Sequence, residues 1–293
     1  MNKRILILSG IIVFSLLLIF NCAGKKVEFW GSAKDGFNLT YRQDAGSKFL
    51  IDYSSHMEQT LDMMGNEQVT SVKSNAEYQV NTSAFDKEKG TDLDILYNKF
   101  TSEFESAGGT MSTDFSGVIG KKANLVLSFN GVTSGFKGFD VLPVIDLPTG
   151  EKNGEREYVF NIRYLFPLLP EIPVKFGDTW QSVQKIEIPL GSGGLNLTLN
   201  YTYKLIEETN IDGIECLRIE GTFKQTGEGE GDSPQGQFTI EGEGEGKDVL
   251  YFAYKKGMFL KYETNSVFEG NVGAAGMEFP LAFKISDKIN ITF

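Results

Sequence analysis

Apolar and polar residues alternate along most of the chain. In residues 196–205 one face of an extended strand carries Leu197, Leu199, Tyr201, Tyr203 and Leu205, and the other carries Asn196, Thr198, Asn200, Thr202 and Lys204. Because successive side chains of a strand point to opposite faces, this period predicts a half-buried antiparallel strand. Residues 279–293 repeat the pattern, and only Asp287 interrupts their apolar row.

Turn sequences separate the alternating runs. They occur at residues 86–90, 107–109, 129–131, 210–213 and 255–257, where Gly and Asn supply the positive φ values that tight turns need. Residues 93–104 have both helical and alternating spacing, and the glycine turn that follows favours a hairpin arm. The 23 Phe and 11 Tyr residues suit a pleated, half-buried surface, so we expect a meander of hairpins.

One segment has the period of a helix. Residues 155–169 carry an apolar stripe formed by Tyr158, Val159, Ile162, Leu165, Phe166 and Leu169. Pro167 and Pro170 lie at its end, where they would terminate the helix. The pattern therefore predicts one short helix over residues 155–169.

The chain also contains a loose internal similarity. Residues 46–49 and 177–180 each open a β-rich half with a glycine turn and a later tyrosine-bearing strand, although two unrelated meanders would look alike to the same degree. We predict a mainly β fold, with antiparallel meanders forming one large curved sheet or two related β layers, and one short helix. The expected divisions are a signal peptide (1–21), a tether (22–26), a first β-rich half (27–150), a helix and proline-rich connection (151–173) and a second β-rich half (174–293).

The N-terminus has the layout of a bacterial lipoprotein signal. Lys3 and Arg4 precede an apolar run over residues 5–20, and Cys22 follows at once. The run has the length of a signal segment and is short for a membrane-spanning helix. Phe20 and Asn21 depart from the usual residues before the lipidated cysteine. The same segment is therefore also compatible with an uncleaved N-terminal anchor or with a signal peptide that is cleaved at another site. We expect an exported protein, lipid-anchored through Cys22 to the bacterial outer membrane and facing the periplasm or the cell surface.

The net charge and the cysteine content exclude some classes of partner and of covalent cross-link. The net charge of −11 becomes more negative once Lys3 and Arg4 are removed, and an acidic surface repels phosphate backbones, so we expect no nucleic-acid partner. With Cys22 acylated, Cys216 is the remaining cysteine, which leaves no disulfide framework. Cys216 stands in an apolar stretch, and we predict that it is a small buried core residue.

The sequence offers little catalytic chemistry. His56 is the single histidine, and no Gly-x-Ser-x-Gly motif is present. One histidine cannot build a histidine-rich zinc site, and its neighbours suggest a solvated position on a strand. We therefore predict a protein that is not an enzyme and has no cofactor.

Three alternating carboxylates form a candidate site. Glu241, Glu243 and Glu245 alternate with glycines and would share one face of a strand. They could bind calcium, or act as the acid and base of a glycosidase-type hydrolase, or form a solvated face that blunts pairing at an exposed sheet edge. The solvated face is favoured. The glycines on the opposite face leave room for aromatic rings or a ligand against the backbone.

Three segments together resemble a bacterial family. They are the signal ending at Cys22, the hairpin sequence at residues 127–133 that runs into 138–140, and residues 169–180, which end in Gly177-Asp178-Thr179-Trp180. This combination resembles a family of bacterial envelope lipoproteins known only as a domain of unknown function. The resemblance implies an exported, often lipidated, β-rich protein, and it supplies no catalytic residues to transfer. From its own context, Trp180 is predicted to anchor the core at the start of a strand.

These observations lead to a functional hypothesis. We expect a non-catalytic cell-envelope lipoprotein that binds an apolar ligand, such as a lipid, in a curved β-sheet. The residues that could line such a site, or equally belong to the core, are Leu197, Leu199, Tyr201, Tyr203, Phe279, Leu281 and Phe283. The alternative is a surface lipoprotein that binds an envelope protein partner at a sheet edge. An outer-membrane β-barrel ending at Phe293 and a carboxylate-based hydrolase are more distant alternatives.

Overall fold

The computed structural model describes residues 29–293 except 87, 149, 191 and 234–235. The predicted signal peptide (1–21), the acylated Cys22 and the tether (22–26) lie outside the described residues. Two short antiparallel pairs accompany the main sheet. They are β1 (Gly31–Ser32) with β2 (Gly36–Phe37), and β9 (Ile145–Asp146) with β10 (Lys152–Asn153).

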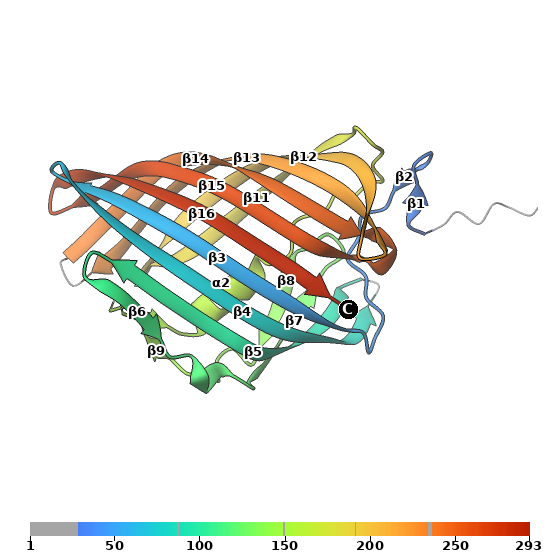
Figure 1. Cartoon of the computed structure of the whole chain (residues 1–293), viewed down its shortest axis with the longest axis horizontal. Coiled ribbons are helices and arrows are strands. Elements are labelled where there is room, and N and C mark those ends of the chain that lie inside the picture. Colours follow the sequence, from blue (N-terminus) through green and yellow to red (C-terminus); the bar gives the residue numbers. More distant parts are fainter. Residues whose placement is uncertain (1–28, 87, 149, 191, 234–235) are drawn as a thin grey trace, which may run out of the picture.

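One antiparallel sheet of 12 strands forms the body of the protein (Figure 1). The strands are β3 (Lys48–Met63), β4 (Asn66–Asp86), β5 (Gly90–Ser106), β6 (Gly109–Thr113), β7 (Lys122–Leu127), β8 (Thr133–Lys137), β11 (Thr179–Leu190), β12 (Gly193–Ile211), β13 (Ile214–Ser233), β14 (Gly236–Ala253), β15 (Met258–Ala274) and β16 (Met277–Thr292). Their order is β11-β12-β13-β14-β15-β16-β3-β4-β5-β7-β8, and β6 pairs with β5. This confirms the mainly β prediction in its single-sheet form.

Within the main sheet, the two β-rich parts of the described chain meet at one strand pair. The C-terminal strand β16 runs antiparallel to β3, with Ile289 opposite Tyr53 and Ser286 opposite His56. The sheet curves so strongly that β11 and β12 lie behind β16 and β3 in the view of Figure 1. Residues more than two hundred positions apart in the sequence therefore become cross-strand neighbours.

The helix α2 (Glu155–Arg163) begins where the sequence predicts and ends six residues earlier. Its first turn is closed by Glu157, whose Oε2 accepts a hydrogen bond of 2.8 Å from the Gly154 N–H. The prediction that the helix reaches residue 169 was wrong. The ring of Pro167 would clash with the carbonyl four residues before it, that of Arg163, so the helix cannot continue past this point.

The sheet has an apolar face and a polar face. The apolar face packs against α2 and the loops between β7 and β11, where Tyr41 is fully buried among the rings of Phe166, Phe252 and Phe259. The Tyr41 hydroxyl donates a hydrogen bond of 2.9 Å to the carbonyl of Pro167, so its burial leaves no unpaired hydroxyl. Cys216 is 0% exposed, as predicted for a core cysteine.

Glycines on the apolar face receive aromatic rings. A Cβ at Gly246 would lie 2.2 Å from Cζ of Phe223, and a Cβ at Gly242 would lie 2.7 Å from Cζ of Phe268. No real side chain tolerates contacts this short, so these positions need glycine. The rings fill the room that the sequence pattern left open for either aromatic side chains or a ligand.

Candidate functional site

The alternating carboxylates lie on the polar face of β14. Glu241, Glu243 and Glu245 are all exposed, as expected for a solvated face. The proposed edge position was wrong, because β14 pairs with β13 on one side and with β15 on the other. Within residues 29–293 and their stated gaps, no group of three His, Cys, Asp or Glu side chains is close enough to hold a metal ion.

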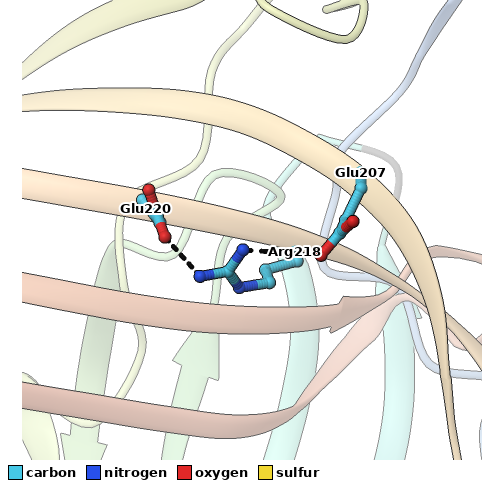
Figure 2. Close-up of polar contacts among 3 residues, drawn as sticks. All are labelled: Glu207, Arg218 and Glu220. Carbon is cyan, nitrogen blue, oxygen red and sulfur yellow. Dashed lines mark hydrogen bonds and ion pairs between the residues drawn. The ribbon is translucent and has the colours of Figure 1, made fainter.

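Other charged groups of the polar face form exposed ion pairs. Arg218 on β13 lies between two carboxylates (Figure 2), with its Nη1 3.4 Å from Oε1 of Glu207 and its Nη2 paired with Glu220. Such solvated pairs contribute about 0–1 kcal/mol each. His56 also stands exposed on β3, as predicted. In the part of the chain that the structure describes, no helix has the length and apolar character needed to cross a membrane.

A hollow of about 950 Å³ opens on the polar face of the central strands. Its lining includes His56, Asn200, Lys224, Lys247 and Lys284. None of the seven residues predicted to line an apolar site borders it. Phe223, Val267 and Ile285 also line the hollow, so its walls mix charged, polar and apolar side chains, which suits a protein surface.

Strand register builds a different feature on the apolar face. A row of directly opposed residues crosses the sheet from β11 to β6 and is rich in polar side chains; we name it the polar belt. Its members are Trp180, Tyr203, Gly221, Asp248, Thr264, Asp287, Ser55, Ser74, Ser102 and Thr113. The belt brings together two carboxylates and six hydroxyl side chains from strands far apart in the chain.

Asp248 is the most deeply buried acid of the belt, at 1% exposure. Its Oδ2 accepts a hydrogen bond of 3.2 Å from the Tyr203 hydroxyl, which reaches across Gly221, while its Oδ1 has no hydrogen-bond partner among the residues that the structure describes. Burial raises the pKa of Asp248 to about 6, while the neighbouring hydroxyl groups of Thr264, Tyr262 and Tyr203 act in the opposite direction. Removal from water therefore outweighs the local hydrogen bonds.

Asp287 is the second acid of the belt and is only partly buried. Its Oδ1 accepts a hydrogen bond of 3.4 Å from the Tyr53 hydroxyl. Desolvation raises the pKa of this carboxyl, while hydrogen bonds from Ser55 and Tyr53 oppose the shift. The sequence pattern marked Asp287 as the break in an apolar row, and the structure shows that the break faces a set of hydroxyl groups.

An apolar row runs beside the belt, one step toward the tips of the β3–β4 and β15–β16 hairpins. Ile285, Met57, Val72, Phe104 and Met111 oppose one another in turn across β16, β3, β4, β5 and β6. The first four are half-buried and Met111 is 44% exposed. Among the described residues, none of the five belongs to the buried core or packs against it.

The predicted lining residues mostly fill the core. Leu197, Leu199, Tyr201, Tyr203 and Leu281 are buried, whereas Phe279 and Phe283 are half-buried. Trp180 opens β11, as predicted, and stacks on Tyr203 with ring centroids 5.5 Å apart; Tyr203 in turn stacks on Tyr201 at 5.2 Å. Met57, Val72 and Phe104 were not among the predicted lining residues, although the alternation within β3, β4 and β5 places each of them on one face of its strand.

Comparisons with known proteins identify remote structural similarity. No protein-family model matches the sequence, and no curated protein matches it. A DUF1329 family protein from Desulfovibrio piger is 14% identical, with 83% of this chain and 85% of that chain covered and a TM-score of 0.16. OccK2 (OpdF) of Pseudomonas aeruginosa, solved with glucuronate, is 8% identical, and a BenF-like porin of Pseudomonas fluorescens is 6% identical; for both the coverage is 85% of this chain and 100% of that chain, and the TM-score is 0.20.

These scores are too low to carry an argument about function. The likeness to a DUF1329 protein agrees with the expected resemblance to an uncharacterised family at that coarse level only. The chain is an antiparallel β protein, as its own strand pairing shows.

Proposed function

We propose that this protein is a non-catalytic cell-envelope lipoprotein that binds an apolar ligand, such as a lipid chain, on the apolar face of its sheet. The observation that carries the proposal is the apolar row, because its side chains are neither packed in the core nor fully solvated. Completing the burial of a large aliphatic or aromatic side chain is worth up to about 1.5–3 kcal/mol. Five adjacent half-exposed side chains therefore offer a substantial apolar contact.

The dimensions of the row suit an extended chain. Five neighbouring strands at a spacing of about 4.8 Å set its first and last side chains about 19 Å apart. Ile285 lies at one end of this line and Met111 at the other, with Met57, Val72 and Phe104 between them. A long acyl chain laid across the strands would contact all five.

The deeper acid supports binding over catalysis. Asp248 is 1% exposed, so its carboxylate cannot touch a substrate in this conformation. His56, the other candidate for acid–base chemistry, faces away from the belt on the polar face. The lipoprotein-type N-terminus supports a location in the cell envelope, with Cys22 as the residue that carries the lipid.

Binding is tested with a neutral fluorescent apolar probe, N-phenyl-1-naphthylamine, and the purified protein. The double variant Met57→Gln/Val72→Gln should weaken probe binding at least about tenfold, because it replaces the middle of the row with polar groups. Val69→Gln is the matched control, since Val69 lies on the same strand β4 as Val72, three positions away on the opposite face, and is 49% exposed. Unchanged binding by a folded double variant would contradict the proposal.

Lipid anchoring needs its own test. Cells fed labelled palmitate should acylate the protein, and Cys22→Ser should abolish both the label and membrane association. Label retained in Cys22→Ser would place the acyl group elsewhere and contradict the assignment.

The hollow on the polar face favours a second candidate function, docking of an envelope protein. Within the described chain, Lys224 and Lys247 form no ion pair, so their ammonium groups are free to meet acidic groups of a partner. Lys224→Glu/Lys247→Glu should then abolish co-purification of a partner from cross-linked cell envelopes. Identical cross-linked products from both proteins would exclude this surface.

A further inference from the structure

The charges beside the apolar row are of one sign. In the polar belt and the apolar row, Asp248 and Asp287 are the ionisable carboxyl groups, and no Lys, Arg or His occupies either row. No cation is among the groups that shift the pKa of either carboxyl. A ligand with a carboxylate or phosphate head would therefore meet two acids and no counter-charge.

Part of the belt is accessible beside the row. Thr264, Asp287, Ser55, Ser74 and Ser102 are half-buried, unlike Asp248. On β16, β3, β4, β5 and β6 the belt residue stands two positions along its strand from the row residue, as Asp287 does from Ile285 and Ser55 does from Met57. This spacing corresponds to about 7 Å, so one amphiphile can contact both features.

The belt offers hydrogen-bond acceptors to a ligand whose head group donates hydrogen bonds. The carboxylate of Asp287 accepts hydrogen bonds, and the hydroxyls of Ser55 and Thr264 on the two flanking strands can accept them as well. Ser74 already donates to Ser102 over 3.2 Å, which shows that hydroxyls of this belt pair with one another across strands. An ammonium group carries three donors and a positive charge, so it satisfies such acceptors and offsets the desolvation of the acid.

From this arrangement we infer that the ligand is a long-chain amphiphile with an ammonium head, bound at Asp287 with its chain along the apolar row. The inference rests on the proposed function, because it uses the same row for the chain. It adds the chemical class of the head and names Asp287 as the residue that selects it. Asp248, with its unpaired Oδ1, adds negative charge behind Asp287 on the same belt.

Three probes of equal chain length test the inference: dodecylamine, dodecanol and dodecanoate. Each competes with N-phenyl-1-naphthylamine for the purified protein, below its micellar concentration and at 0.15 M salt, which screens distant charges. Dodecylamine should displace the probe at a concentration at least about tenfold lower than dodecanoate does. Asp287→Asn should remove that preference while leaving dodecanol displacement unchanged, since one charge-assisted hydrogen bond is worth about tenfold or more.

The net negative charge of the protein needs a matched control. Glu243→Gln removes one exposed carboxylate from the polar face and should leave the preference for dodecylamine intact. Ser55→Ala is a milder second variant, expected to weaken dodecylamine about two- to fivefold if Asp287→Asn does not fold.

The outcomes separate the two proposals. Equal or tighter binding of dodecanoate would overturn the ammonium assignment, and so would a preference that survives in folded Asp287→Asn. If the neutral probe binds and depends on Met57 and Val72, such a result leaves the apolar site in place. If the neutral probe does not depend on the row, the proposed function itself fails.

Discussion

Replacing the buried acid Asp248 with Asn should change how stability depends on pH. The folded protein holds the proton of this carboxyl up to a pKa of about 6, against an ordinary value of 3.8. Between about pH 4 and pH 6 the folded state therefore keeps a proton that the unfolded chain has already released. Stability from this group is fully present below pH 3.8 and is lost as the pH rises through 6. The raised pKa of Asp287 acts in the same direction.

The size of the effect follows from the shift. A change from 3.8 to about 6 is roughly two pKa units, and each unit corresponds to about 1.4 kcal/mol, so ionisation of Asp248 costs about 3 kcal/mol above pH 6. Asn has the same shape and cannot ionise, and its side-chain oxygen can still accept the hydrogen bond from Tyr203. We expect Asp248→Asn to exceed the wild type in unfolding free energy by up to about 3 kcal/mol at pH 7.5, and to match it near pH 4.

Urea unfolding at pH 4, 5, 6 and 7.5 measures this difference, provided that the slope against urea is the same in both proteins. Glu243→Gln on the polar face of β14 controls for the loss of one negative charge from the same strand. A wild type and an Asp248→Asn variant with parallel pH profiles would refute the reasoning. So would a variant that is less stable than the wild type at pH 7.5.

Two further predictions concern packing and reactivity. Gly246→Ala should destabilise the protein by about 1–3 kcal/mol in urea unfolding, because its Cβ would lie 2.2 Å from the ring of Phe223. Gly108→Ala is the control, since the nearest atom to its Cβ would be 3.6 Å away. Equal effects of the two substitutions would show that glycine is not sterically required at position 246. The Cys216 thiol is buried and its pKa is raised to about 11, so a maleimide should modify it at pH 7.5 only in urea, as located by peptide mass; rapid modification of the folded protein would contradict its burial.

Local patterns predicted the elements of this fold well. Alternation assigned Leu197 and Tyr203 to one face, the helix began at Glu155 as its apolar stripe indicated, and Cys216 proved to be core. Each of these depends on residues close in sequence, whose spacing alone determines which side chains share a face. The end of the helix at Arg163 was missed, because Pro167 acts four residues ahead of its own position.

The candidate site could not be predicted in the same way. Alternation shows that Ser55 and Asp287 each lie on a particular face of their own strand, but it does not say which strand pairs with which. A change of one residue in register would move every side chain of a strand to the opposite face relative to its partner. The assignment of Glu241, Glu243 and Glu245 to a sheet edge was wrong for the same reason. The alternation within a strand does not show whether other strands pair with it on both sides.

By itself, therefore, the sequence determined the mainly β class, the strand faces, the place of the short helix and the acidic surface. Tertiary structure alone decided that β16 pairs with β3, that Asp248 and Asp287 share one belt with Ser55, Ser74 and Ser102, and that the apolar row stands beside it. The reason is physical. Local conformation follows from neighbours along the chain, whereas strand order and register minimise the free energy of the whole sheet, in which residues more than two hundred positions apart are in contact.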